Sequence, residues 1–290
     1  MSLLATRFAP SPTGLLHLGH AASALLAYEW AKKQGASFHL RIEDIDRTRC
    51  KPEFEAAIFE DLHWLGLRWQ TPVIRQSDHL ANFTAALEKL HDQKVLYRCF
   101  LTRREVLSQS LSAPHGPGFI YLGAKTQIPP QQEAELLQQQ KPFAWRLSLA
   151  RAKAVLGNSW EKLHWLETGC GPDGQTGIIQ AKPDQLGDVI LARKDINTSY
   201  HLAVTHDDAA QGITHVIRGQ DLFESTHIHV LLQALLKLPT PTYCHHGLLL
   251  GADGNRLAKR DGAASLRQLR VSGLNAKDVR KMAQIQVNHP

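Results

Sequence analysis

Two histidines at the start of a helical pattern are the first residues of this chain whose types and spacing suggest chemistry. His17 and His20 stand three residues apart, with Gly19 between them, directly after a proline-rich turn. A glycine lets a ligand approach the backbone closely, and the N–H groups at a helix N-terminus attract phosphate. A helix cap with two exposed histidines is the alternative. The position between a strand and a helix, where α/β folds bind ligands, favours a phosphate site.

A second cluster, of cations, stands far along the chain. Arg256, Lys259 and Arg260 fall within five residues, inside a glycine-rich loop over 251–262. Three positive charges at this spacing are able to neutralise a triphosphate in a transition state. Taken alone, the segment would be interpreted as a solvated basic loop, so its meaning depends on the histidine motif.

Alternating strands and helices surround the two motifs. Apolar alternation predicts strands, and apolar residues spaced three and four apart predict helices. We predict strands over 5–9, 37–42, 188–191 and 213–217, and helices beginning near residues 19 and 52 and covering 80–90 and 228–235. This order indicates a parallel α/β sheet.

The middle of the chain has a different pattern. Over 97–182 the periodicity weakens and proline, glycine and glutamine become frequent, with a short polar helix predicted after Pro129-Pro130. We therefore predict an α/β domain whose first half covers 1–96 and whose second half, with the basic loop, covers 183–270. Residues 97–182 would be an inserted subdomain, and 271–290 a short polar tail.

Composition restricts the class of protein. The chain has 290 residues, 43% apolar and 21% charged, which is typical of a soluble globular protein with a real core. No apolar run approaches the roughly 20 residues of a membrane span, and the N-terminus lacks a signal-peptide pattern, so we expect a cytoplasmic protein without a membrane partner. Lys and Arg exceed Asp and Glu by 33 to 27, which fits an RNA partner or a merely basic enzyme. Nothing indicates an obligate protein partner.

Together the two motifs resemble the HIGH and KMSKS signatures of class I aminoacyl-tRNA synthetases. The stretch from Arg7 to Gly14 is similar to the opening of the glutamyl and glutaminyl branch of that class. Further similar blocks follow in the right order: Arg41-Ile-Glu43-Asp44-Ile-Asp46, which resembles the glutamyl form R-I-E-D-T-D, then Tyr200-His-Leu-Ala-Val, Asp207-Asp208 and Val216-Ile-Arg218-Gly219-Gln-Asp221-Leu. The resemblance covers about residues 5–270, and five ordered blocks are far more specific than one motif.

The resemblance implies a class I synthetase fold, a Rossmann-like parallel sheet with an inserted α+β subdomain that contacts RNA. Full-length members carry an anticodon-binding half after the KMSKS loop, whereas this sequence continues for about thirty residues past Lys259. We therefore expect no anticodon-binding domain. In this the chain is similar to the truncated paralogues of the glutamyl branch. Those activate L-glutamate with ATP in the absence of tRNA, and then esterify the cyclopentene diol of queuosine at the wobble position of tRNA(Asp).

The resemblance also implies roles for individual residues. The expected catalytic residues are His17, His20 and Lys259, with Mg²⁺ on the phosphates of ATP. The expected ATP contacts are Pro10, His17, Gly19, His20, Arg256 and Lys259, and the expected glutamate pocket consists of Arg7, Ser11, Glu43, Tyr200 and Arg218. In that pocket arginines bind carboxylates and Glu43 binds the ammonium. A carboxylate is already a nucleophile at neutral pH, so activation needs positioning and charge stabilisation, and no general base.

The sequence departs from the family at a zinc site in the predicted insertion. Relatives often hold zinc with C-x-C, a tyrosine and a cysteine four residues on. Here Cys99 is followed by Leu101 and Tyr121 by Lys125, while His115 is a poor substitute. Zinc prefers four well-placed nitrogen or sulfur ligands. We therefore expect a degenerate site that binds no zinc.

Three alternatives stay open. A truncated glutamyl-tRNA synthetase would charge the 3′ end of a tRNA instead of queuosine. A small-molecule nucleotidyltransferase would not need the blocks at Arg7 and Glu43. A non-catalytic RNA-binding paralogue would not need His17, His20 and Lys259, all of which are present.

Overall fold

The first strand and helix form where the hydrophobic pattern places them. In this computed structural model the described residues are 4–108, 111–112, 119–120, 128–249 and 264–285. Strand β1 (Ala5–Phe8) is buried along its whole length, and helix α1 (Leu18–Gln34) buries an alanine-rich face. The helix ends at Gly35, whose left-handed φ of 61° suits a glycine cap. Strand β2 (Ser37–Ile42) then runs parallel to β1.

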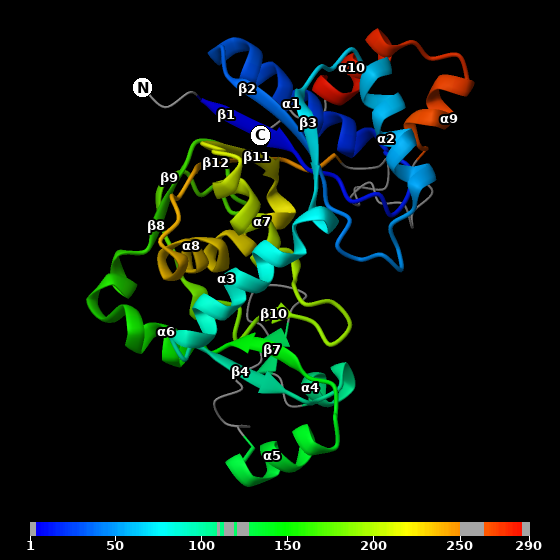
Figure 1. Ribbon diagram of the computed structural model, residues 1–290. Helices are drawn as coiled ribbons and strands as arrows, with labels where there is room; N and C mark the ends of the chain where they lie inside the picture. Colours follow the sequence, from blue (N-terminus) through cyan, green and yellow to red (C-terminus); the bar gives the residue numbers. More distant parts are fainter. Residues whose placement is uncertain (1–3, 109–110, 113–118, 121–127, 250–263, 286–290) are drawn as a thin grey trace.

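Two groups of parallel strands meet in the main domain. Strand β2 pairs with β1 and with β3 (Gln70–Arg75), while β11 (His215–Gly219) pairs with β12 (Thr242–His246). Strands β1 and β11 lie side by side (Figure 1), and the Thr214 N–H donates to the Ala5 carbonyl oxygen at 3.0 Å. The strand order is therefore β3-β2-β1-β11-β12, and the chain progression reverses between β1 and β11. Ligands of open α/β sheets bind at such a reversal, outside the carboxyl ends of the strands.

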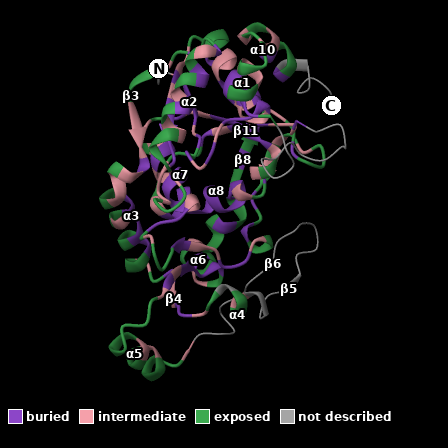
Figure 2. Ribbon diagram, turned by 90° about the vertical axis from the view of Figure 1, so that its right-hand side faces the viewer, coloured by how far each residue is buried: buried purple, intermediate pink, exposed green. Residues whose placement is uncertain are grey.

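Helices cover both sides of these strands. They are α2 (Pro52–Trp64), α3 (Leu80–Asp92), α7 (Tyr200–Ala210) and α8 (Ser225–Leu236), in addition to α1. One core cluster lies between α1, α2 and β2, and a second one between α3, α8 and the strands of the β11 side. Figure 2 shows the buried residues concentrated on α1 and α8, whereas α5 in the lower part is largely exposed.

The inserted subdomain contains an antiparallel sheet of its own. Its strand order is β10 (Ile190–Ala192), β7 (Ala144–Leu147), β4 (Leu96–Cys99). The accompanying elements are α4 (Arg103–Ser108), the pair β5 (Leu111–Ser112) and β6 (Phe119–Ile120), α5 (Pro130–Gln138) and α6 (Leu149–Leu156). Helix α5 has no buried residue, as predicted for the polar helix after Pro129-Pro130.

The predicted far boundary of the insertion at residue 182 is wrong. Strands β8 (His164–Glu167) and β9 (Gly177–Gln180) fall inside the predicted insertion, yet β8 pairs in parallel with β12 of the main domain. Strand β10, predicted to resume the main sheet, pairs with β7 of the subdomain instead. The chain therefore reaches the main domain at β8, where Trp165 packs on Phe223 and Tyr243, and enters the subdomain again at β10. Local periodicity does not reveal such distant partners.

The segment predicted to be a short polar tail after residue 270 is largely helical over its described part. Helices α9 (Leu266–Val271) and α10 (Ala276–Ile285) follow the basic loop, and α10 packs against α1. Val279 and Ala283 are almost wholly buried. They stand four residues apart on one helix face, so a sparse apolar stripe is enough to anchor an otherwise polar helix.

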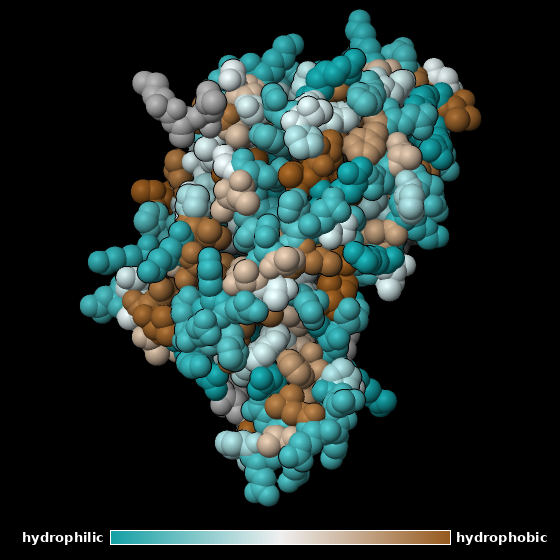
Figure 3. Space-filling model, viewed as in Figure 1, coloured by the Kyte–Doolittle hydropathy of each residue, from teal (hydrophilic) through white to brown (hydrophobic). Residues whose placement is uncertain are grey.

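The surface seen in Figure 3 is mainly hydrophilic, with hydrophobic side chains in small patches. Among the described residues, none of the helices is both long and apolar enough to cross a membrane.

Candidate active site

A cavity of about 360 Å³ opens at the reversal of strand order, where the segments that follow β1, β2 and β11 meet the start of α1. Every described residue that was expected to act in catalysis or to bind ATP or glutamate lines it: Arg7, Pro10, Ser11, His17, Gly19, His20, Glu43, Tyr200 and Arg218. The structure thus brings the predicted ATP contacts and the predicted glutamate pocket into one cavity. Arg256 and Lys259 lie outside the described residues.

His17 and His20 hold each other at the start of α1. The Gly19 N–H donates to His17 Nδ1 at 3.1 Å, and the His17 N–H donates to His20 Nδ1 at 3.2 Å. This reciprocal capping box fixes both rings, whose centroids are 3.8 Å apart. The histidines therefore cap the helix and line the cavity at once. Fewer N–H groups stay free for phosphate than the sequence suggests, because His17 accepts the one from Gly19.

Gly19 also has no space for a side chain. An added Cβ would lie 2.9 Å from His17 Cε1, closer than such atoms approach in proteins. A larger residue would push the His17 ring out of its capping position. Because Gly19 has no side chain, the backbone stays accessible from the cavity and the His17 imidazole keeps its capping position.

A buried network of opposite charges forms a second wall. Arg7 Nε donates to Asp208 Oδ1 at 2.9 Å, and Arg41 Nη1 donates to the same oxygen at 2.6 Å. Arg41 Nη2 donates to Glu43 Oε1 at 3.0 Å. Arg41 is wholly buried, so it supports Arg7 and Glu43 from behind the cavity. Arg41 and Asp208 both stand in the sequence blocks named above, but neither was expected to have a role.

The charges of this wall shift its carboxyl groups in different directions. Burial raises the pKa of Glu43, although Arg41 and Arg7 oppose that effect. Burial would also raise the pKa of Asp208, but Arg7 and Arg41 outweigh it and hold that pKa below its ordinary value. Asp208 therefore stays ionised within the network. The ionised form of Glu43 is less favoured, and a further cation in the cavity would stabilise it.

Arg218 lines the opposite side of the cavity without a carboxylate partner among the described residues. Its side chain is 5% exposed. Its donors all meet neutral groups: Nε meets His245 Nε2 at 3.1 Å, Nη1 is 3.4 Å from both the Tyr200 hydroxyl and His229 Nδ1, and Nη2 meets the Leu222 carbonyl at 3.1 Å and Thr226 Oγ1 at 2.7 Å. A buried cation without an anion is costly, and an anionic ligand would compensate it.

The groups beside Arg218 stay uncharged at neutral pH. Burial lowers the pKa of His201 to about 4, with Arg218 adding to the effect. Burial also lowers the pKa of His229 well below its ordinary value. Burial raises the pKa of Tyr200 to about 12, so its hydroxyl keeps its proton. Neither histidine was expected at the site from the sequence. Their signal was weak, since only the position of His201 next to Tyr200 connects it with a motif.

Several further residues of the cavity were not assigned from the sequence. They are Thr13, Ser23, Arg49, Asp221 and His246, among others. Ser23 Oγ and His246 Nε2 are 2.9 Å apart, which joins α1 to the end of β12 across the cavity wall.

The predicted zinc site is described only in part. Cys99 is buried at the end of β4, whereas His115, Tyr121 and Lys125 fall outside the described ranges. Within those ranges, no group of three or more His, Cys, Asp and Glu side chains could hold a metal ion.

Comparisons with known proteins agree with the fold. Residues 3–286 match the family model described as tRNA synthetases class I (E and Q), catalytic domain. The chain is 46% identical to a glutamyl-Q tRNA(Asp) synthetase of Rhodobacter capsulatus, over 96% of this chain and 98% of that protein. It is 40% identical to a protein of the same name from Nocardia farcinica, over 95% and 82%.

Glutamate–tRNA ligases are more distant relatives. The Aquifex aeolicus protein is 36% identical, over 94% of this chain and 55% of the ligase. The crystal structure of a glutamate tRNA ligase from Elizabethkingia meningosepticum, in complex with its amino acid, aligns with a TM-score of 0.70 at 28% identity, over 89% of this chain and 52% of that one. The chain thus spans about half the length of these ligases. As the motifs implied, it belongs to the class I tRNA synthetases of the glutamyl and glutaminyl type.

Proposed function

We propose that this protein activates L-glutamate with ATP to glutamyl-adenylate and then transfers the glutamyl group to queuosine of tRNA(Asp). The observation that carries the proposal is the charge arrangement of the cavity. Arg218 is a buried cation whose described partners are all neutral, and Glu43 across the cavity is a buried carboxylate whose pKa burial raises. A zwitterionic acid with a carboxylate and an ammonium would satisfy both groups.

Activation follows from this arrangement. Arg218 and Arg7 bind the carboxylates, Glu43 binds the ammonium, and Ser11 and Tyr200 add hydrogen bonds. A carboxylate oxygen attacks the α-phosphorus of ATP, a new P–O bond forms, and pyrophosphate leaves with the electron pair of the broken bond. No proton has to be removed, because the attacking group is already ionised. The work of the protein is to hold two anions together against their repulsion.

ATP lies, in this proposal, against Pro10, Gly19 and the two histidines. The backbone at Gly19 permits close approach, and the capping box keeps His17 and His20 at the cavity wall. Mg²⁺ bound together with ATP would neutralise part of the charge of its phosphates. Arg256 and Lys259 are proposed to reach the phosphates from the basic loop.

Transfer requires the inserted subdomain to hold RNA. A hollow of about 330 Å³ on this subdomain is lined by aromatic and cationic side chains, among them Lys141, Phe143, Trp145, Arg193 and Lys194. Single-stranded RNA is read by stacking on such rings and by contacts of cations with phosphate. The cis-diol of queuosine would present the adenylate with much the same nucleophile as a terminal ribose. Because ATP and tRNA are its substrates, we place the reaction in the cytoplasm.

The second candidate is charging of the 3′ end of tRNA(Glu). The 36% identity to the Aquifex aeolicus ligase favours it, but the identities of 46% and 40% to proteins named glutamyl-Q tRNA(Asp) synthetase favour queuosine. Both candidates share the activation step and differ in the acceptor.

One assay in two stages tests the proposal. Glutamate-dependent exchange of pyrophosphate into ATP, measured without tRNA, should proceed, and aspartate should not replace glutamate. Labelled glutamate should then pass to tRNA(Asp) that bears queuosine. Absence of exchange would refute activation without tRNA. Label on tRNA(Glu), or equal label on tRNA(Asp) without queuosine, would refute the acceptor and favour the second candidate.

A further inference from the structure

We propose that Glu167 and His245 form a positioning relay that orients Arg218 toward the substrate carboxylate. The inference rests on the proposed function, since it assumes that Arg218 binds glutamate. Neither residue lines the cavity, and Glu167 lies in the part of the chain that the sequence assigned to the insertion. The three side chains come from β8, β12 and β11, which are neighbours in the main sheet.

The relay is a continuous chain of hydrogen bonds in the protein interior. Glu167 Oε2 lies 2.6 Å from His245 Nδ1, and His245 Nε2 lies 3.1 Å from Arg218 Nε. Glu167 and His245 are each 1% exposed. These hydrogen bonds therefore link the buried carboxylate of Glu167 to the buried guanidinium of Arg218 through one imidazole.

The donors of the chain fix the tautomer of His245. Arg218 Nε always carries a hydrogen, so His245 Nε2 has to accept it. Nδ1 then carries the ring proton and donates it to Glu167. A doubly protonated His245 ring would point an N–H at the Arg218 guanidinium, which already donates there. Burial and Arg218 also lower the pKa of His245, despite the opposing effect of Glu167, so the ring stays neutral. The neutral tautomer with hydrogen on Nδ1 is the one that the geometry permits.

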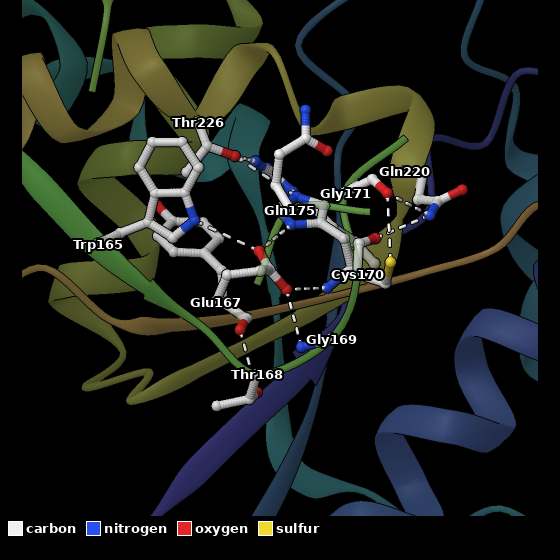
Figure 4. Close-up of polar contacts among 12 residues, drawn as sticks. Trp165, Glu167, Thr168, Gly169, Cys170, Gly171, Gln175, Gln220 and Thr226 are labelled. Carbon is white, nitrogen blue, oxygen red and sulfur yellow. Dashed lines mark hydrogen bonds and ion pairs between the residues drawn. The ribbon is translucent and has the colours of Figure 1, made fainter. Parts of the chain in front are cut away.

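Glu167 is itself held on all sides. Its Oε1 accepts the backbone N–H groups of His245 at 2.8 Å and Gly169 at 2.9 Å, and its Oε2 accepts the Trp165 indole N–H at 3.3 Å. Figure 4 shows this carboxylate among Trp165, Thr168 and Gly169. An added Cβ at Gly169 would lie 2.1 Å from the His245 carbonyl oxygen, so the chain can approach β12 this closely only at a glycine.

The consequence for Arg218 is a fixed orientation. His245 fixes the direction of Nε, while Thr226 and the Leu222 carbonyl fix Nη2. Among the described residues, Arg218 Nη1 meets only the Tyr200 hydroxyl and His229 Nδ1, each at 3.4 Å. It is therefore the edge of Arg218 that the substrate carboxylate can engage. Small misplacements of a binding group cost on the order of 10²-fold in rate. Burying the Glu167 carboxylate beside a neutral imidazole is costly, so orientation of Arg218 is a better explanation of the relay than stability.

Two variants of His245 separate orientation from general structure. His245→Leu removes the acceptor for Arg218. His245→Gln can place its amide oxygen near the position of Nε2 and so restore the acceptor. In glutamate-dependent pyrophosphate exchange, we expect His245→Leu to lower kcat/KM for glutamate on the order of 10- to 100-fold, mainly through a higher KM for glutamate. KM for ATP should be unchanged. His245→Gln should recover to within a few-fold of wild type. His164→Leu, an exposed histidine on the same strand as Glu167, is the matched control.

Two outcomes would overturn the relay: a folded His245→Leu with unchanged kinetics for glutamate, or a His245→Gln as impaired as His245→Leu. Thermal unfolding of each variant identifies loss of the fold. The ¹⁵N shifts of the His245 ring in the free wild-type protein give a readout that does not depend on activity. We expect an unprotonated Nε2 whose signal moves in Arg218→Gln. A protonated Nε2 refutes the relay even when exchange is intact, whereas absence of exchange in wild type refutes the proposed function.

Discussion

Glu43→Gln removes one charge from the cavity and nearly preserves its shape. In the folded chain, Glu43 is 9% exposed and accepts from Arg41 at 3.0 Å. The amide oxygen of glutamine can accept the same bond. Arg41 also keeps Asp208 at 2.6 Å, so the substitution leaves no unpaired buried cation. The change therefore acts chiefly on the expected partner of Glu43, the ammonium group of glutamate.

The magnitude follows from the kind of bond that is lost. Hydrogen bonds to charged groups contribute roughly 1.5–3 kcal/mol, and each 1.4 kcal/mol is about tenfold. We expect kcat/KM for glutamate to fall roughly 10- to 100-fold in pyrophosphate exchange. Glutarate has both carboxylates without the ammonium, and its inhibition constant should change far less. The preference of the wild type for glutamate over glutarate should therefore shrink in Glu43→Gln.

The pH dependence gives a second signature of Glu43. Burial raises the pKa of Glu43, so its protonation begins at a higher pH than that of an ordinary glutamate. Because only the carboxylate attracts the ammonium, KM for glutamate should rise as pH falls through that raised pKa. Glu43→Gln should lack this rise.

An equal loss for glutamate and glutarate would refute the reasoning, and so would activity of Glu43→Gln within about threefold of wild type. Glu88→Gln, an exposed position on α3, is the control for the loss of one negative charge. It should match the wild type in every measurement.

Three further outcomes are expected. Lys259→Ala should lower glutamate-dependent pyrophosphate exchange about 10²–10³-fold with an intact fold, and a loss of only a few-fold would contradict its assignment. Metal analysis of the purified protein should find less than one zinc per chain, and a chelator should not reduce activity once Mg²⁺ is restored; one tightly held zinc would contradict this and implicate Cys99 and Tyr121. Burial raises the pKa of Asp61 to about 6 despite Arg270 at 3.9 Å, and neither carboxylate oxygen of Asp61 has a hydrogen-bond partner among the described residues. The folded chain then binds more protons than the unfolded chain between about pH 4 and 6, so the contribution of Asp61 to stability falls as pH rises through that window. Asp61→Asn should remove this dependence and raise the urea midpoint at pH 7.5 but not at pH 4, and equal midpoints at both pH values would argue against it.

Local signals in the sequence predicted several of the individual elements, and the family resemblance indicated part of the cavity lining. Strand β2 covers 37–42 and α2 begins at Pro52, as predicted, because apolar spacing and a proline at the first helical turn act on neighbouring residues. The motifs also named Arg7, Glu43, Tyr200 and Arg218, which line one cavity in the structure. Short motifs carry this information because each one joins a chemical group to the end of an element.

The tertiary structure alone decided how distant segments pair and what supports the site. Strand β8 joins β12 across more than seventy residues of sequence, and α10 buries only Val279 and Ala283 on its described part. Neither partner is visible in local periodicity, because burial of one face depends on what packs against it. The same holds for the charges behind the cavity. Glu167, His245 and Arg218 become neighbours only when three strands align, and the lowered pKa values of Glu167 and His245 depend on that arrangement.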